Sequence, residues 1–153
     1  GIALSVRANT VALEYLTGGF AEVSFTAEIE GVQVRGRADY LKPSGGIVDL
    51  KTTKSASPKA FAKSIAEYRY HVQAALYTDL AEANGLFIPD FTFIAVEKTY
   101  PYAVAIYQLD AQALERGREL YRRDLAIYKH CLEMDDWPGY PEEVQVLSLP
   151  AWA

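Results

Sequence analysis

Residues 37 to 53, RADYLKPSGGIVDLKTT, combine a strong turn signal with two acids and a lysine in strand-like surroundings. The turn-forming residues 43 to 46, PSGG, separate two stretches that alternate as β-strands do. Because neighbouring side chains of a strand point to opposite faces, Asp49 and Lys51 share one face of the second strand. If the two strands pair as a hairpin, Asp39 at the end of the first strand converges with Asp49 and Lys51.

The cluster of Asp39, Asp49 and Lys51 has a physical cost that needs a reason. Two carboxylates and an ammonium group are expensive to bury together in the middle of a sheet. A divalent metal ion bound by the carboxylates would offset that cost and give the cluster a function. The sequence therefore predicts a metal site on this hairpin.

The length and composition favour a single domain, residues 1–153. Half of the residues are hydrophobic and 23% are charged, which allows a substantial core. There is no apolar run of about 18 residues and no visible signal peptide, so no contact with a membrane is expected. The single Cys131 cannot form an internal disulfide and fits a reducing cytoplasm. Because the chain opens on Gly1 without a start methionine, an N-terminally truncated fragment is an open alternative.

The distribution of charge matters more than its sum. The formal net charge of −5 argues weakly against a nucleic-acid partner, which basic surfaces usually bind. However, residues 51 to 69 carry five basic residues and one acid, and they directly follow the acidic pair. This basic run is either a nucleic-acid contact or a solvated helix face.

The periodicity of the chain predicts an α/β fold, with a central mixed β-sheet flanked by helices and a core order α-β-β-β-α-β. One long helix is expected over residues 57–84, with Tyr68 in its apolar stripe. No glycine-rich phosphate loop follows any strand, which disfavours P-loop or Rossmann nucleotide binding. The expected helices are residues 1–17, 57–84 and 111–134, and the expected strands are 20–28, 32–41, 46–52, 91–97 and 101–109, with a short extended piece at 144–149.

The pattern of Asp39, a strand turn and then Asp49-Leu50-Lys51 resembles the PD-(D/E)XK nuclease superfamily, whose fold is that of restriction endonucleases. The next helix carries Gln73 and Tyr77, which match the Gln-X-X-X-Tyr motif of the branch that includes the RecB nuclease domain and phage exonucleases. VDLKTT, YRYHVQAALY, FTFIAVEKTYPYAV and WPGY…LSLPAWA are similar to the C-terminal nuclease domain of the exodeoxyribonuclease VIII (RecE-like) family. The resemblance extends over nearly the whole chain.

This resemblance implies an activity, a cofactor and partners. The expected activity is that of a Mg²⁺-dependent deoxyribonuclease, with Mn²⁺ as a substitute. It would be a 5′→3′ exonuclease on double-stranded DNA ends that acts in homologous recombination and DNA repair. The relatives form ring-shaped homo-oligomers around DNA, and a single-strand annealing protein is a further expected partner. The expected location is the cytoplasm of a bacterial or phage-infected cell.

The resemblance also implies the metal ligands. Mg²⁺ prefers hard oxygen ligands, and Asp39, Asp49 and the backbone carbonyl of Leu50 would supply them. Lys51 would orient the attacking water and stabilise the negative charge of the phosphate. Glu22 lies in a Gly-X-X-Glu-X-Ser context, where an acid of the first strand either binds the metal or is a solvated strand residue.

Other residues are expected to contact DNA. Gln73 and Tyr77 are one helical turn apart, and they either contact DNA near the cleaved bond or form a polar pair between helix and sheet. Hydroxyl and ammonium groups after the catalytic strand can hold phosphates without reading sequence. The residues expected in this role are Thr52, Thr53, Lys54 and Arg37, with Arg37 alternatively paired to a nearby acid.

One departure from the family leaves alternatives open. Many members of this branch place a histidine or glutamate ligand on a helix upstream of the first strand, where this chain offers only Glu14. Either Glu14 contributes, or the ligand lies outside the sequence. The rival interpretations are a structure-specific endonuclease of the RecB branch and a catalytically weak or idle DNA-binding module. The lone Cys131 cannot hold the iron–sulfur cluster found in some nucleases of that branch.

Overall fold

A five-stranded mixed sheet forms the centre of the computed structural model, which describes residues 1–153. The strands follow one another across the sheet in chain order. Strands β3 and β4 are parallel, and the other neighbours are antiparallel. The strands are β1 (Phe20–Ile29), β2 (Val32–Leu41), β3 (Ile47–Thr53), β4 (Phe91–Glu97) and β5 (Val104–Gln108).

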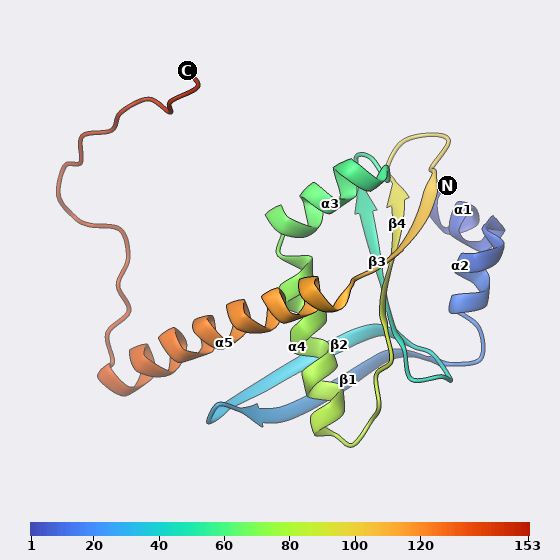
Figure 1. Ribbon diagram of the computed structural model, residues 1–153, viewed down its shortest axis with the longest axis horizontal. Helices are drawn as coiled ribbons and strands as arrows, with labels where there is room; N and C mark the ends of the chain where they lie inside the picture. Colours follow the sequence, from blue (N-terminus) through green and yellow to red (C-terminus); the bar gives the residue numbers. More distant parts are fainter.

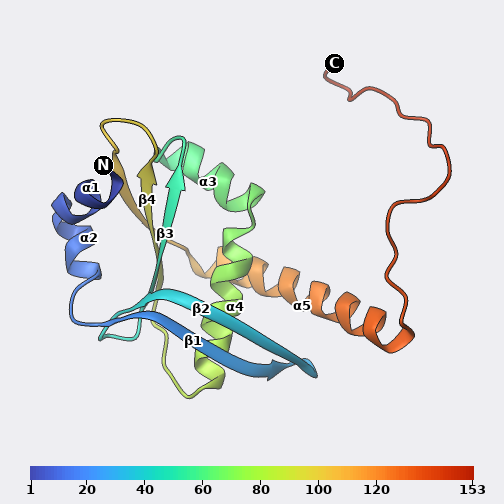
Figure 2. The same ribbon diagram turned by 180° about the vertical axis from the view of Figure 1, so that it is seen from behind.

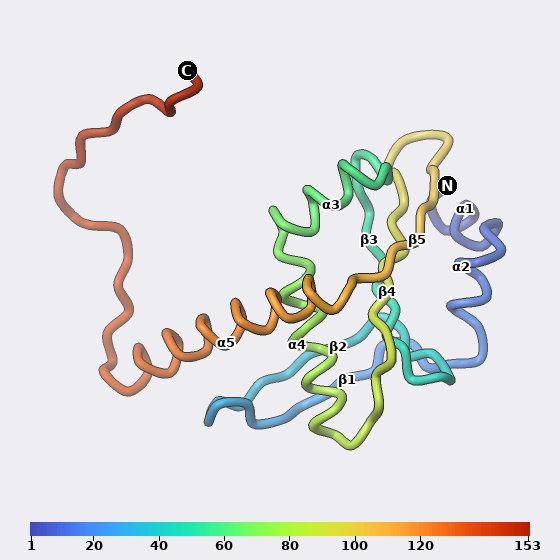
Figure 3. Tube along the Cα trace, in the orientation of Figure 1, coloured from blue at the N-terminus to red at the C-terminus, as the bar shows by residue number.

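Helices cover both faces of the sheet (Figures 1 and 2). Helices α1 (Ile2–Ala8) and α2 (Thr10–Tyr15) lie on one face, and α3 (Pro58–Glu67) and α4 (Tyr70–Ala83) on the other. Helix α5 (Ala111–Met134) packs on α4, and its second half extends away from the sheet (Figure 3). The predicted α/β architecture with a central mixed sheet is therefore confirmed. None of the helices combines the length and apolar content needed to cross a membrane.

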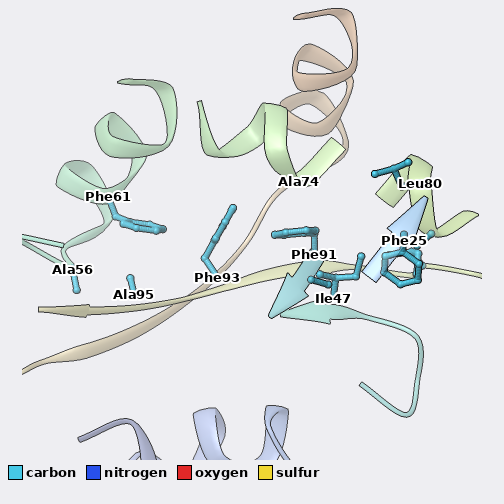
Figure 4. Packing of buried hydrophobic residues seen from close by; sticks show 12 residues of the cluster. Phe25, Ile47, Ala56, Phe61, Ala74, Leu80, Phe91, Phe93 and Ala95 are labelled. Carbon is cyan, nitrogen blue, oxygen red and sulfur yellow. The ribbon is translucent and has the colours of Figure 1, made fainter. Parts of the chain in front are cut away.

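The larger core lies between the sheet and helices α3 and α4. Phe61 of α3 meets Phe93 of β4 edge to face with ring centroids 5.9 Å apart, and Phe91 continues the row (Figure 4). Because β3 and β4 run parallel, the chain must cross over between them, and α3 and α4 form that crossover. Strand β4 is buried on both faces, which explains its nearly continuous apolar sequence.

The expected first helix over residues 1–17 is wrong in one respect, since it is divided at Asn9. Asn9 has extended backbone angles, and its side chain accepts a hydrogen bond from the Ala12 backbone N–H at 2.9 Å. Asparagine is a strong N-cap and a poor residue for a helix interior, so it ends α1 and begins α2.

The expected long helix over residues 57–84 is also wrong, because it divides at Arg69. Arg69 has left-handed backbone angles, φ 58° and ψ 37°, and its guanidinium pairs with Asp124 of α5. Tyr68 is consequently 63% exposed and does not belong to the buried stripe. The strand expected from residue 101 begins only at Val104, because residues 99–102 form a turn. Residues 144–149 form no strand.

Candidate active site

The site forms where β2 and β3 separate. The two strands pair only at Tyr40–Val48 and Leu41–Ile47. Beyond these pairs, the Leu50 backbone N–H donates to Asp39 Oδ2 at 2.9 Å. The Asp39 carboxylate therefore takes the place of a β2 backbone carbonyl as the acceptor for Leu50. This hydrogen bond holds the side chain at the point where the two strands diverge.

Asp49 is the buried centre of the site, with only 2% of its surface exposed. Its Oδ1 accepts a hydrogen bond from Gln73 Nε2 at 3.3 Å. Its Oδ2 forms an ion pair with Lys51, whose Nζ lies 2.7 Å away, and accepts no further hydrogen bond. Lys51 is thus the one protein partner of this buried oxygen.

The electrostatics of Asp49 follow from this burial. Loss of solvent raises the pKa of Asp49 from 3.8 to about 6, even though Lys51 lowers it in part. The Asp39 carboxylate raises the pKa further, because two like charges lie close together. At neutral pH Asp49 is ionised against an energetic penalty, which a bound cation would relieve.

Gln73, on the first turns of α4, connects Lys51 to Asp49. Lys51 Nζ donates to Gln73 Oε1 at 2.8 Å, and the same amide donates to Asp49 through its nitrogen. Lys51 Nζ also lies 4.4 Å from the centre of the Tyr70 ring, within cation–π range. Three contacts therefore hold the ammonium in place beside the Asp49 carboxylate: Gln73, Asp49 and the Tyr70 ring.

Tyr77 lies one turn beyond Gln73 and reaches a different place. It lines a pocket of about 370 Å³ together with Ser24, Arg35 and Arg37. A Cβ atom on Gly36 would lie 2.6 Å from Tyr77 Cε1, so glycine is needed for this close approach. The structure therefore brings Gln73 to the carboxylates but directs Tyr77 to a neighbouring basic pocket.

A polar cleft of about 570 Å³ lies beside Tyr70, which stands under Lys51. The expected residues Thr52, Thr53 and Lys54 line it. The Thr53 hydroxyl donates to the Ser55 carbonyl at 3.1 Å, which gives it a local structural role. Sequence reasoning missed the lining residues from other elements, because only the crossover brings them here: Ala60, Ser64, Glu67, Tyr68, Tyr70 and Lys98.

Glu22 does not join the carboxylate pair. It has a left-handed φ of 58°, and its carboxylate pairs with Arg37 Nη1 at 2.8 Å in solvent. No group of three or more His, Cys, Asp or Glu side chains in the chain could hold a metal ion. Neither Glu22 nor Glu14 therefore completes a three-residue set with Asp39 and Asp49.

The sheet order, the forked hairpin and the Asp39, Asp49 and Lys51 cluster define a PD-(D/E)XK-type domain. The family described as "PDDEXK-like domain of unknown function (DUF3799)" matches residues 2–150. The chain belongs to this PDDEXK-like family, and the resemblance to the PD-(D/E)XK superfamily is confirmed. Family and fold together support a nuclease.

One solved structure agrees with this fold. The crystal structure of a protein from Eubacterium rectale, described as a "putative exonuclease", has a TM-score of 0.80 at 19% identity. The match covers 97% of this chain and 60% of that one, so this chain spans less than two thirds of its relative. SSO0001 reaches a TM-score of only 0.45 at 20% identity, over 71% of this chain and 51% of its own. No curated protein matches the chain.

Proposed function

We propose that this domain is a Mg²⁺-dependent deoxyribonuclease that hydrolyses phosphodiester bonds. The observation that carries the proposal is the buried Asp49 carboxylate next to the Asp39 carboxylate, where the ion pair with Lys51 does not offset the cost of burial. These hard oxygens fit Mg²⁺, which keeps several water ligands and needs few from the protein. Asp39, Asp49 and the Leu50 carbonyl would hold the ion, and Mn²⁺ would substitute for Mg²⁺.

The chemistry follows from these positions. When bound, Mg²⁺ would supply positive charge for the phosphate and lower the pKa of water. Lys51 directs a second positive charge at the same place, where negative charge grows on the phosphate oxygens in the transition state. The Gln73 amide hydrogen-bonds to both Lys51 and Asp49, which keeps the ammonium next to the carboxylate. Thr52 and Lys54 would hold the phosphates of the strand in the cleft.

We further propose a 5′→3′ exonuclease on double-stranded DNA ends that acts in homologous recombination. This rests on the resemblance of the Asp49-Leu50-Lys51 and Gln73-to-Tyr77 motifs to RecE-like exonucleases. The description of the Eubacterium rectale relative points the same way. A ring-shaped homo-oligomer around DNA, an annealing protein as partner and a cytoplasmic location belong to the same proposal.

A second candidate function is a catalytically weak DNA-binding module. The observation in its favour is that only two acidic side chains meet at the site, with no third His, Cys, Asp or Glu beside them. Such a domain would bind DNA but turn over slowly. A comparison of binding with cleavage therefore separates the two candidates.

The test is digestion of an end-labelled linear DNA duplex with Mg²⁺ and with EDTA. Wild-type protein should release nucleotides only with Mg²⁺, and Asp49→Asn, which keeps the shape of the side chain, should release none. A covalently closed circle should resist digestion by an exonuclease. DNA binding without Mg²⁺-dependent cleavage would leave only the binding module, and cleavage that survives Asp49→Asn would refute the assigned site.

A further inference from the structure

Two tyrosines stack where the helical crossover is interrupted. The rings of Tyr68 and Tyr70 lie with centroids 5.7 Å apart and an interplanar angle of 29°. In a continuous α-helix, side chains two residues apart project about 200° away from each other and cannot stack. The left-handed backbone of Arg69 makes this stack possible, although that conformation is unfavourable for any residue with a side chain.

The two rings have different surroundings. Tyr70 is anchored in the core, 6.2 Å from Phe61 and 5.9 Å from Phe93, and it stands under Lys51 Nζ at 4.4 Å. Tyr68 lies over Tyr70 and is 63% exposed. The exposed ring of Tyr68 is therefore separated from the Lys51 ammonium only by the ring of Tyr70.

The cleft beside the two tyrosines has the chemistry of a nucleic-acid groove. Lys54 and Lys98 supply ammonium groups, and Thr52, Ser55 and Ser64 supply hydroxyls. Glu67 is the one acid in the lining, so the two lysines leave the cleft with a net positive charge. Such groups hold a phosphate backbone without reading its sequence. Aromatic rings beside a positively charged groove are the combination that binds unpaired nucleotides, because every base offers a flat face for stacking.

We infer that Tyr68, supported by Tyr70, is a stacking platform for a terminal or unpaired base next to the phosphate at Lys51. The inference rests on the proposed function and adds a substrate preference to it. Inside a duplex, neighbouring bases cover both faces of each base, so only a strand end or an unpaired nucleotide can use the platform. The site therefore selects DNA ends over duplex interiors, with no preference for sequence.

The test measures binding without metal, so that cleavage cannot interfere. Fluorescence anisotropy in EDTA compares a duplex carrying a short single-stranded overhang with the same duplex closed by hairpins at both ends. Wild-type protein should bind the overhang duplex more tightly. Tyr68→Ala should weaken that binding by about 5- to 150-fold, and it should leave binding of the closed duplex unchanged.

Two further variants make the result specific to stacking. Tyr68→Phe keeps the ring and should bind as wild type does. Tyr140→Ala removes a tyrosine that is 99% exposed in the C-terminal tail and should also change nothing. A terminal 2-aminopurine should lose fluorescence on binding to wild type and to Tyr68→Phe, but not to Tyr68→Ala.

The outcomes separate the platform from the nuclease. Wild-type cleavage of linear DNA combined with unchanged overhang binding by Tyr68→Ala overturns the platform and leaves the proposed function intact. A loss in Tyr68→Phe equal to that in Tyr68→Ala also overturns it, because the hydroxyl and not the ring would then bind DNA. If wild type neither binds nor cleaves any DNA, the proposed function itself fails.

Discussion

Replacing Asp49 by asparagine should stabilise the metal-free protein while removing its activity. Asp49 ionises with its pKa raised from 3.8 to about 6, mainly because it is buried. That difference corresponds to about 3 kcal/mol at neutral pH, and it already includes the attraction to Lys51. The asparagine side chain would resemble the neutral acid in shape, so Asp49→Asn should gain up to about 3 kcal/mol, or roughly 6–12 °C in Tm for a chain of this size.

The sign of this effect sets its pH dependence. Because the folded state binds the proton of Asp49 more tightly than the unfolded chain does, this residue favours folding below about pH 4. The contribution is lost as the pH rises through about 6. Wild-type and Asp49→Asn proteins should therefore be similarly stable near pH 4, and the variant should be the more stable of the two at pH 7.5.

The assay is thermal and urea unfolding in EDTA at pH 4, 5, 6 and 7.5. Glu22→Gln is the matched control, because it removes an exposed acid from β1 of the same sheet and should change stability little. Addition of Mg²⁺ should stabilise wild type and not the variant. If Asp49→Asn were no more stable than wild type at pH 7.5, or if the two pH profiles ran parallel, the burial argument would be refuted.

Three further substitutions test separate parts of the structure. Lys51→Ala should lower the cleavage rate by about 10²- to 10³-fold, with little change in the Mg²⁺ concentration at half-maximal activity. Gly36→Ala should cost about 1–3 kcal/mol in urea unfolding, because the new Cβ would lie 2.6 Å from Tyr77 Cε1. Asp79→Asn should cost about 3 kcal/mol in the same assay, because it weakens a bidentate ion pair with the half-buried Arg118.

Each of these predictions has a matched control. Lys59→Ala removes an exposed lysine of α3 and should leave the cleavage rate unchanged. Gly139→Ala adds a Cβ with no neighbour within 4 Å and should leave stability unchanged. Glu119→Gln disrupts an exposed pair within α5 and should cost well under 1 kcal/mol. Losses in the controls as large as in the test variants would contradict the assigned contacts.

The cluster of Asp39, Asp49 and Lys51 could be predicted because the interactions that form it are local in the sequence. A strong turn signal at residues 43–46 and the two-residue period of strands are enough to bring Asp39, Asp49 and Lys51 together. Strand β4 was equally clear, since a short and nearly continuous apolar run is typical of a buried strand. Both features depend on residues that are close in the sequence, so a sequence pattern is enough to predict them.

The helix break at Arg69 could not be predicted, because its cause lies 55 residues away in Asp124. Nothing in residues 57–84 opposes a continuous helix, and no glycine or proline marks the division. The left-handed backbone of Glu22 was likewise hidden, and with it the pairing of Glu22 with Arg37 in place of the carboxylates. Lys98 entered the cleft only because the crossover places the end of β4 beside the end of β3.

Helix α5 packs on α4 and contributes no residue to the candidate site, yet its contacts hold α4, which does. It packs so closely on α4 that a Cβ on Gly117 would lie 2.1 Å from the His71 carbonyl oxygen. Arg118 binds Asp79 of α4, while Asp124 holds Arg69 at the point where α4 begins. Both ends of α4 are thus attached to α5 through charged groups. Since α4 carries the glutamine that joins the ammonium to the buried carboxylate, the contacts of α5 help to fix the geometry of the candidate site.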